Sequence, residues 1–337
     1  MTRIPVVLLT GFLGSGKTTL LNHWLSQRQD LALIINELGE VGIDQHLTQR
    51  AGVPVTLMAG GCLCCVIQGS LSSTLRNLYM ARQAGDLPAF SALVIETTGA
   101  ADPFNVLSVL AQDPWLKKRF VWQSVITVVD AVAGVDAVAR HPEVLEQITA
   151  ADQLVISKSD QVDADSLAIL RQQLSGLNAG ASQLVAEHGR VTADLLEISH
   201  EPRCRVTGMF SPANVTAASP LTTASPASRH GLYSASLRWP GQLPWSLWQA
   251  ALAQLGEDSG DTLLRVKGLL RVEGLDGPLL VQWVGGQAPQ LSPLTVWPDA
   301  DADSRLVLIV RHDDPAFAAT VLNHWQTLLE KLQHPPH

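Results

Sequence analysis

The sequence predicts an α/β protein in which a doubly wound, mostly parallel sheet is followed by a smaller α+β unit. Short β-rich runs alternate with helical patterns through the first two hundred residues, and several runs are apolar on both faces, as strands are when helices cover both sides of a sheet. A stretch rich in Ser, Thr, Ala and Pro then interrupts the chain. Beyond it, strands follow one another closely, which is typical of an antiparallel sheet.

The predicted elements of the first part follow the hydrophobic periodicity. Its strands are Val6–Thr10, Leu31–Asn36, Val53–Met58, Ala92–Glu96, Val121–Asp130, Gln153–Ser157 and Ser182–Ala186. Its helices are Lys17–Arg28, Leu71–Arg82, Phe104–Ala111 and Ser166–Leu174.

The Ser211–Ser228 stretch is predicted to be a linker, because it holds almost nothing that could build a core. We place the first domain at residues 1–198, the linker at 199–229 and the C-terminal domain at 230–337. The predicted elements of the C-terminal domain are strands at Leu232–Trp239, Leu263–Val272, Leu279–Val284, Leu291–Val296 and Leu306–Val310, and helices at Trp245–Leu255 and Pro315–Leu332.

Composition narrows the classes of partner and the compartment. The chain has 337 residues, a net charge of −8 and no cluster of Lys and Arg, which disfavours nucleic acid and anionic membranes as partners. No uncharged apolar run reaches ~18 residues, so no membrane span is expected. The apolar run after Arg3 lacks a signal-peptide cleavage site, and we interpret the chain as cytoplasmic. A structural disulfide is not expected in that reducing compartment.

The strongest local signal is LLTGFLGSGKTTLL, in which Gly11–Thr18 fits the phosphate-loop pattern GxxxxGK followed by Ser or Thr. A predicted strand enters it and a predicted helix leaves it. The glycines allow backbone N–H groups to surround phosphate oxygens, and the helix N-terminus adds partial positive charge. Lys17 is expected to reach the β- and γ-phosphates, and Thr18 is expected to ligate Mg²⁺. The predicted phosphate-binding residues are Gly11, Gly14, Ser15, Gly16, Lys17, Thr18 and Thr19.

The stretch LVISKSD predicts a preference for guanine, because it ends an apolar strand with a Lys-x-Asp. Asp160 would accept hydrogen bonds from guanine N1 and N2, and the stem of Lys158 would lie against the ring. Ser157 stands where GTPases have Asn or Thr, and its shorter side chain gives less support. A solvated charged loop is the alternative. Ala186–Val191 would place N–H groups near guanine O6.

Two further strand ends carry acids. In ALVIETTG, Glu96 is expected beside the phosphate loop, where it could hold Mg²⁺ through water, and the N–H of Gly99 could contact the γ-phosphate. Glu96 could instead be a helix-capping or surface acid. Lys17, Thr18 and Glu96 are the predicted catalytic residues. Asp130 is predicted to cap a helix beginning at Ala131.

The stretch GGCLCC concentrates Cys62, Cys64 and Cys65, three of the four cysteines in the chain. Three thiolates and a carboxylate form a tetrahedral set that suits Zn²⁺ first, with Co²⁺, Ni²⁺ or Cu⁺ as alternatives. Glu37 and Glu40 follow the preceding strand and could meet the cysteines at one sheet edge. The alternatives are buried thiols and a solvated acidic loop.

Taken in order, GFLGSGKTTL, NELGEVGID, GGCLCC and ETTG resemble the CobW-type GTPases, a family of metal chaperones or insertases. LLRVKGLLRVEG resembles a stretch of the family's C-terminal domain. The resemblance implies GTP binding, slow GTP hydrolysis and zinc binding at C-x-C-C, with Glu40 and Glu37 as oxygen ligands. Members often carry a His-rich tract between the domains; here only His200 and His230 stand near its ends, which favours one bound ion over bulk storage.

The sequence therefore predicts a GTPase of low intrinsic turnover that delivers zinc to a client protein. A P-loop kinase or ATPase with structural cysteines is the alternative, and a non-catalytic metal buffer is a third interpretation. The identity of the client and a homodimeric state are both left open.

Overall fold

The computed structural model describes residues 3–37, 55–59, 66–178, 181–187, 190–191, 231–285, 288–297 and 302–333. The chain divides into two compact units, Met1–Ser175 with Gln183–His200 and Gly176–Ser182 with Glu201–His337. Each unit has its own sheet and its own core.

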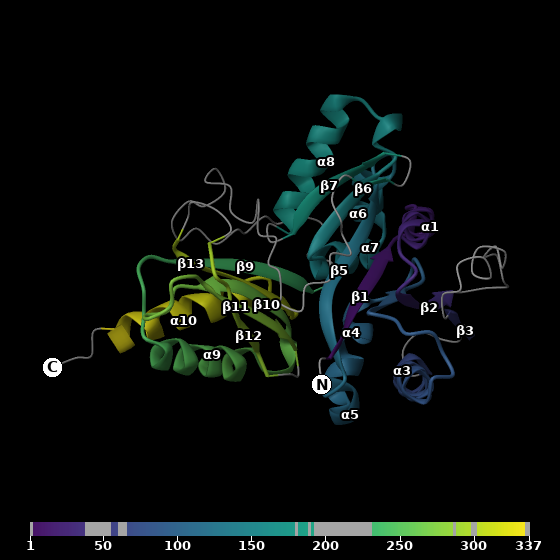
Figure 1. Ribbon diagram of the computed structural model, residues 1–337. Helices are drawn as coiled ribbons and strands as arrows, with labels where there is room; N and C mark the ends of the chain where they lie inside the picture. The colour runs from purple at the N-terminus through teal and green to yellow at the C-terminus, as the bar shows by residue number, and fades with distance from the viewer. Residues whose placement is uncertain are drawn as a thin grey trace. The chain divides into compact units, whose positions relative to one another are not determined.

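The first unit is built on an eight-stranded sheet in the order β3-β2-β4-β1-β5-β6-β7-β8 (Figure 1). Strands β1 to β6 pair in parallel, and β8 pairs antiparallel with β7. The strands are β1 (Ile4–Gly11), β2 (Leu31–Glu37), β3 (Val55–Ala59), β4 (Ala92–Glu96), β5 (Phe120–Asp130), β6 (Gln153–Ser157), β7 (Ser182–Glu187) and β8 (Arg190–Val191).

Helices cover both faces of this sheet. The helices are α1 (Lys17–Gln27), α3 (Val66–Ala84), α4 (Pro103–Gln112), α5 (Pro114–Lys117), α6 (Gly134–Arg140), α7 (Pro142–Ala150) and α8 (Ala164–Leu177). Ile126 and Val128 of β5 share a core cluster with α1, whereas the Thr127 hydroxyl between them donates to the Gln147 carbonyl of α7 at 2.7 Å. Because alternate side chains of a strand face opposite sides, α1 and α7 lie on opposite faces.

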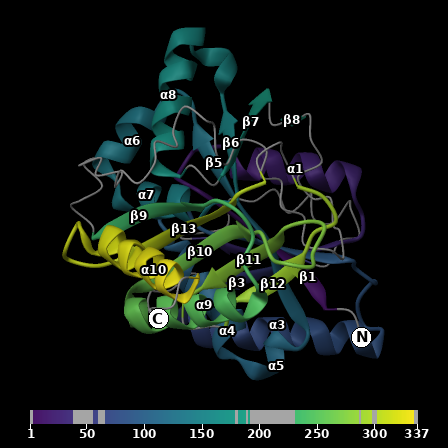
Figure 2. The same cartoon turned by 90° about the vertical axis from the view of Figure 1, so that its left-hand side faces the viewer.

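The second unit is a five-stranded antiparallel sheet in the order β12-β11-β10-β13-β9. Its strands are β9 (Leu232–Trp239), β10 (Leu263–Leu270), β11 (Leu279–Val284), β12 (Gln290–Pro293) and β13 (Ser304–Arg311). Its helices, α9 (Trp245–Ser259) and α10 (Phe317–Gln333), lie side by side in Figure 1 and Figure 2.

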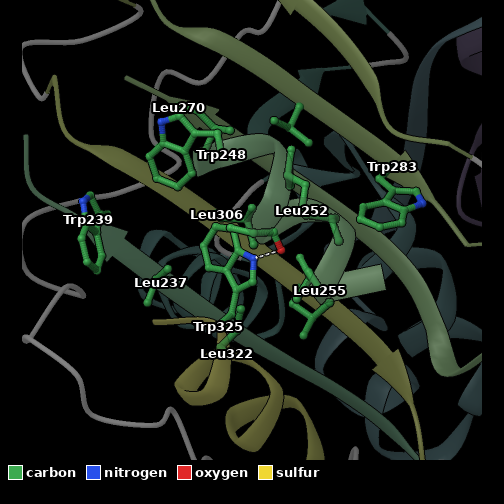
Figure 3. Close-up of a cluster of buried hydrophobic side chains, with 14 of the residues drawn as sticks. Leu237, Trp239, Trp248, Leu252, Leu255, Leu270, Trp283, Leu306, Leu322 and Trp325 are labelled. Atoms are coloured by element: carbon green, nitrogen blue, oxygen red, sulfur yellow. Dashed lines mark hydrogen bonds between the residues drawn. The ribbon is translucent and has the colours of Figure 1, made fainter. Parts of the chain in front are cut away.

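Two tryptophans hold the core of the second unit together. Trp248 of α9 and Trp325 of α10 are fully buried, with ring centroids 5.8 Å apart. Each indole N–H has a partner: Trp248 donates to the Arg271 carbonyl at 3.1 Å, and Trp325 donates to the Ala251 carbonyl (Figure 3). Satisfied indole N–H groups let these large side chains be buried without the cost of an unpaired donor.

The predicted fold class is confirmed for both units. Each predicted strand and helix that falls on the described residues is present, with ends that differ by a few residues. The strand expected at Leu291–Val296 is shorter, since β12 ends at Pro293, which has no N–H to continue a ladder. Helices α6 and α7 fill the interval between β5 and β6, where the sequence predicted only a helix beginning at Ala131. No helix in the described ranges is both long and apolar enough to cross a bilayer.

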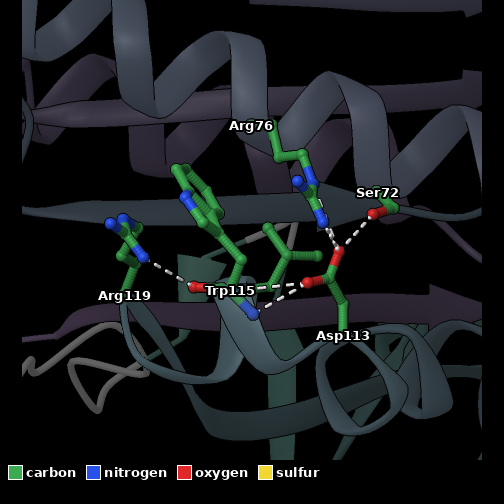
Figure 4. A network of polar contacts seen from close by, with 6 residues as sticks. Ser72, Arg76, Asp113, Trp115 and Arg119 are labelled. Carbon is green, nitrogen blue, oxygen red and sulfur yellow. Dashed lines mark hydrogen bonds and ion pairs between the residues drawn. The ribbon is translucent and has the colours of Figure 1, made fainter.

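A partly buried carboxylate, Asp113, joins α3 to the segment that links α4 and α5. Asp113 caps α5 by accepting from the N–H groups of Trp115 at 2.9 Å and Leu116 at 3.2 Å, and it accepts 2.7 Å bonds from Ser72 and Arg76 of α3 (Figure 4). Burial by itself would raise the pKa of Asp113. The bonds from Ser72, Arg76 and the two backbone N–H groups outweigh it and lower the pKa to about 2.

We expect Asp113→Asn to destabilise the chain at neutral pH by about 1–2 kcal/mol, because the amide keeps the helix cap but loses the ion pair. The folded pKa lies below the unfolded value of 3.8, so this stability is present above about pH 4. It is lost as the pH falls towards 2. Urea unfolding at pH 7 and pH 3 measures the free energy of unfolding of both proteins, and the difference between Asp113→Asn and wild type should be smaller at pH 3.

Asp136→Asn is the matched control, because Asp136 pairs with Arg140 on a helix surface where both side chains are more than 70% exposed. Its loss should change the free energy of unfolding by no more than about 0.5 kcal/mol at either pH. An Asp113→Asn deficit of the same size at both pH values would contradict the ion-pair explanation.

Candidate functional site

The predicted functional residues gather at one edge of the parallel sheet. Strands β1 to β6 end at Gly11, Glu37, Ala59, Glu96, Asp130 and Ser157, respectively. Because these strands pair in parallel, their carboxyl ends share one edge, which is where open α/β sheets bind ligands.

The glycine-rich loop between β1 and α1 has a shape that requires its glycines. Gly11, Gly14 and Gly16 have φ values of 140°, 74° and 97°. A Cβ on Gly11 would lie 2.3 Å from the carbonyl oxygen of Val128 in β5, so the loop starts against its neighbouring strand. Gly16 precedes α1 and no side chain caps that helix. The first-turn N–H groups are therefore available to an anion.

Lys17, Thr18 and Glu96 meet at the start of α1. The Lys17 ammonium donates to the carbonyls of Gly11 at 2.9 Å and Phe12 at 3.1 Å. The Thr18 hydroxyl donates to Glu96 Oε1 at 3.3 Å, and Glu96 is only 4% exposed. A hydroxyl and a carboxylate this close form an oxygen donor set that suits Mg²⁺, which commonly takes one or two protein oxygens and several waters.

Gly99, after β4, lies directly against the phosphate loop. A Cβ on Gly99 would lie 2.5 Å from the backbone nitrogen of Leu13 and 2.6 Å from its Cγ. The chain after Glu96 and the chain after Gly11 therefore pack backbone to backbone. A shift of one loop must move the other.

The Ser157 hydroxyl connects the loop after β6 to the phosphate loop. It donates to the Ser15 carbonyl at 2.6 Å and is within 3.3 Å of the Val129 carbonyl. The short side chain is thus sufficient to reach the phosphate loop in this fold. The bond ties the predicted base-selecting loop to the predicted phosphate-binding loop.

Lys158 has a left-handed backbone, with φ 54°, which no other non-glycine residue in the described ranges shares. Such a conformation costs of order 1–3 kcal/mol and persists where neighbouring contacts enforce it. Here the Ser157 carbonyl accepts from Ala131 at 2.9 Å, and the Lys158 carbonyl accepts from Gln161 at 3.0 Å. The strained residue is therefore fixed on both sides.

Asp130 has a role that the sequence did not indicate. Its Oδ2 pairs with Lys158 Nζ at 2.5 Å, while its Oδ1 accepts from the N–H groups of Val132 at 2.8 Å and Ala133 at 3.4 Å. The predicted helix start at Ala131 is wrong, because α6 begins at Gly134 and residues 131–133 form a turn. Asp130 caps that turn and orients Lys158.

Asp160 lies in a short 3-10 helix, Ser159–Gln161, and is exposed. It makes no hydrogen bond or ion pair with any residue that the structure describes. Ser159 beside it donates to the Ala186 carbonyl of β7 at 3.4 Å, which brings the loop after β6 to the end of β7. Residues 188–189 of the predicted Ala186–Val191 contact lie outside the described ranges.

Most of the predicted zinc ligands lie outside the described residues: Cys62, Cys64, Cys65 and Glu40. Glu37 is the last residue of β2, and its Cα pairs in register with Ala59, the last residue of β3. The acidic segment and the cysteine segment therefore leave from adjacent strands at the same edge as the phosphate loop. Within the described ranges, no group of three or more His, Cys, Asp or Glu side chains could hold a metal.

Gln147 of α7 also belongs to this site, although the sequence analysis did not identify it. Its Nε2 donates to the carbonyls of Gly99 at 3.0 Å and Ala101 at 3.3 Å. The available signal was a polar residue on an apolar helical face, since Val144, Gln147 and Ile148 follow the i, i+3, i+4 spacing.

A cavity of about 630 Å³ lies in the second unit, between α9 and the sheet. Its lining is mostly apolar, with Trp245, Leu252 and Trp283 among the residues and Glu257 at its wall. It lacks the convergent polar groups that mark a reactive site. We therefore place the candidate functional site at the phosphate-loop edge of the first unit.

These features define a P-loop nucleotide-binding protein, because the glycine loop, its lysine, the helix N-terminus and the acidic strand end converge at one edge of a parallel sheet. The chain belongs to the CobW/HypB/UreG family, whose nucleotide-binding domain matches residues 5–185. The C-terminal domain of the cobalamin synthesis protein CobW matches residues 232–326. The resemblance noted in the sequence is confirmed.

Characterised relatives resemble the chain over most of its length. The zinc chaperone YjiA of Escherichia coli is 31% identical across 84% of this chain and 87% of its own. The zinc chaperone CobW of Pseudomonas aeruginosa is 30% identical across 96% of this chain and 91% of its own. The crystal structure of zinc-bound YjiA GTPase from E. coli superposes with a TM-score of 0.66 at 26% identity, covering 96% of this chain and 99% of that one.

Gly99→Ala should impair nucleotide binding, because the added methyl group would push Leu13 and the phosphate loop out of position. We expect a loss of about 1–3 kcal/mol in stability from overpacking and a fall in nucleotide affinity of at least tenfold. Calorimetric titration and thermal unfolding measure the two effects.

Gly176→Ala in α8 is the control, because nothing lies within 4 Å of the added atom. That change should leave nucleotide affinity unaltered and stabilise the helix slightly. Wild-type affinity in Gly99→Ala would mean that the contact with Leu13 is not needed for binding.

Proposed function

We propose that this chain is a GTPase of low intrinsic turnover that binds one zinc ion and transfers it to a client protein in the cytoplasm. The observation that carries the proposal is the shared edge: the strands that precede the acidic and cysteine segments end at the same sheet edge as the phosphate loop, with β4 between β2 and β1. The zinc chaperones YjiA and CobW, which resemble the chain along most of its length, support the same function.

In this proposal, guanine is selected by the loop after β6. Asp160 accepts hydrogen bonds from guanine N1 and N2, and Lys158 lies along the ring. Exposure and the lack of a described partner leave the Asp160 carboxylate available for this role. The bond from Ser157 to the Ser15 carbonyl fixes the distance between the base loop and the phosphate loop. The two loops would therefore hold the base and the phosphates of the nucleotide at a fixed separation.

The phosphates are held by the loop N–H groups, the Lys17 ammonium and the first turn of α1. An ammonium has three donors, so Lys17 can contact phosphate while retaining a loop carbonyl. Mg²⁺ held by Thr18, with Glu96 on one of its waters, would neutralise charge that develops during phosphoryl transfer. Glu96 is not a surface acid, since it is buried beside Thr18.

Turnover should be slow because no arginine or glutamine stands out in the nucleotide-binding motifs as a catalytic residue. Gln147 is buried and its amide is already engaged with loop carbonyls. Positioning the attacking water would then depend on the metal or the client.

The zinc ligands in this proposal are Cys62, Cys64 and Cys65, with Glu37 and Glu40 supplying oxygen. Three thiolates with one oxygen ligand suit Zn²⁺, and Co²⁺ or Ni²⁺ could occupy the same set. The oxygen ligand would be the exchangeable one, so that a client ligand could replace it during transfer. A client protein and a second copy of the chain are the partners to be sought.

A P-loop kinase or ATPase with structural cysteines is the competing function. It would need an acceptor pocket beside the phosphates, and it would give the Lys-x-Asp after β6 no role. Nucleotide preference separates the two functions.

GTP should compete far better than ATP for the wild-type chain. Asp160→Ala should weaken GTP binding by ~2–4 kcal/mol, because the buried guanine donors would lose a charged acceptor. Asp165→Ala removes an exposed carboxylate from the same segment and should have no effect. Lys17→Ala should weaken both nucleotides. Equal affinity of the wild-type chain for GTP and ATP would exclude guanine selection.

One Co²⁺ ion per chain should bind with sulfur-to-metal charge transfer and tetrahedral d–d bands, and Zn²⁺ should displace it. Cys64→Ala should remove most of this spectrum. Affinity should fall with pH, because protons compete for the thiolates. The cysteine outside the cluster provides the control, since Cys204→Ala should leave the spectrum intact. An unchanged spectrum after replacing Cys64 and Cys65 together would locate the metal elsewhere.

Zinc affinity, measured by titration once with GDP–Mg²⁺ and once with a non-hydrolysable GTP analogue, tests whether the metal site and the nucleotide site are coupled. Affinities that differ by ~1–3 kcal/mol would couple the two sites, and linkage requires zinc to change GTP affinity equally. Glu40→Ala should reduce the coupling while leaving thiolate binding. Identical zinc affinities in both nucleotide states would leave only a metal buffer with an independent GTPase site.

A further inference from the structure

Gln147 is a buried polar residue of α7 that is hydrogen-bonded to the loop after β4. It lies on α7, is only 1% exposed, and donates its side-chain amide to the carbonyls of Gly99 and Ala101 at 3.0 and 3.3 Å. Both acceptors are in the loop that follows Glu96. A single side chain therefore fixes this loop on the side of α7.

The backbone of Gln147 is itself anchored. Its carbonyl accepts from the Thr127 hydroxyl of β5 at 2.7 Å. The chain of contacts therefore runs from the central sheet to α7 and then to the loop after β4. The amide has a rigid base from which to position Gly99.

The other end of the amide has no partner. Gln147 Oε1 is buried, and no hydrogen-bond donor among the described residues reaches it. Buried acceptors are rarely left unpaired, which marks a site where the polar group has a purpose beyond packing. The cavity of about 30 Å³ that Gln147 lines also borders Phe12 and Leu13 of the phosphate loop. The amide thus lies beside both loops.

Gly99 transmits this restraint to the nucleotide. Its Cα lies so close to the backbone of Leu13 that a Cβ would come within 2.5 Å of the nitrogen. The orientation of the Gly99 peptide is therefore limited by Leu13 on one side and by Gln147 on the other. The Gly99 carbonyl shares a peptide plane with the Ala100 N–H, so the bond from Gln147 fixes that plane. Together with the contact at Leu13, this restricts the backbone rotation at Gly99 on which the direction of its own N–H depends.

We propose that Gln147 is a positioning residue that holds the loop after β4 so that the Gly99 N–H faces the γ-phosphate, and that it thereby sets the preference for triphosphate over diphosphate. The inference rests on the proposed function, in which GTP and GDP occupy the phosphate loop. Gln147 acts through Gly99 and does not touch the nucleotide. Its loss should therefore affect only states that contain a γ-phosphate.

The competing explanation is that Gln147 merely satisfies two buried carbonyls. In that case its removal would lower stability and weaken both nucleotides to the same degree, because GDP and GTP share the same loop. The ratio of the two affinities separates the explanations, whereas stability does not, because both explanations predict that it falls.

The test measures the affinity of Gln147→Met for GDP–Mg²⁺ and for a non-hydrolysable GTP analogue by calorimetry. Met has a similar length but no donor. We expect the analogue to bind at least tenfold more weakly and GDP to remain within about twofold of wild type. If Gln147→Met does not fold, Gln147→Asn shortens the reach by one methylene and should lower the same ratio by a smaller factor.

Gln183→Met is the matched control, since Gln183 also donates its side-chain amide, to the Arg171 carbonyl at 3.0 Å and the Ser175 hydroxyl at 2.9 Å, but to α8 and not to the loop after β4. It should lower the unfolding temperature without changing the affinity ratio. A folded Gln147 variant with an unchanged ratio, or with equal losses for both nucleotides, would overturn this inference alone. A wild-type chain that binds neither guanine nucleotide would overturn the proposed function, and this inference with it.

Discussion

The phosphate loop of this chain depends on close backbone packing that admits no side chain at two glycines. Gly11 lies against the Val128 carbonyl of β5, and Gly99 lies against Leu13. Replacing either hydrogen with a methyl group would bring a carbon within 2.5 Å of backbone atoms, which cannot give way as a flexible side chain can. The position of the loop is therefore set by the ends of β4 and β5 as much as by the loop's own sequence.

Hydrogen bonds from more distant segments complete this arrangement. Ser157 of β6 donates to the Ser15 carbonyl, and Gln147 of α7 donates to the Gly99 carbonyl. Both donors are buried. A buried polar group without a partner costs free energy, whereas a hydrogen-bonded one is held rigidly in place. The site therefore consists of the loops after β1, β4 and β6, held in fixed positions relative to one another. A movement of one of these loops would displace the other two.

Charge at the edge of the sheet is arranged in a similar way. Asp130 uses one oxygen to cap the turn after β5 and the other to hold Lys158, whose left-handed backbone is strained. The exposed Asp160 two residues later has no such partner among the described residues and remains available to a ligand. One carboxylate organises the loop and the other is presented by it. These two roles follow from burial. The Asp130 side chain is only 16% exposed and contacts its own loop, whereas Asp160 is exposed and can contact a ligand.

Local patterns in the sequence were sufficient for the fold class, the two sheets and the residues of the phosphate loop. Strand alternation, the GxxxxGK spacing and the linker composition are all properties of neighbouring residues, and each can be assessed without knowing what lies across the sheet. The ends of elements were less predictable. The expected helix at Ala131 begins at Gly134, because Asp130 stabilises a turn there instead.

The sequence by itself determined that a nucleotide-type phosphate loop, an acidic strand end and a cysteine cluster belong to one chain with parallel strands. Only the tertiary structure decided which groups meet. The insertion of β4 between β1 and β2 brings Glu96 beside Thr18 across 78 residues of sequence. The packing of α7 brings Gln147 to Gly99 across 48 residues. Such contacts depend on strand order and helix docking, and the hydrophobic periodicity that specifies each element is the same whatever its neighbours are.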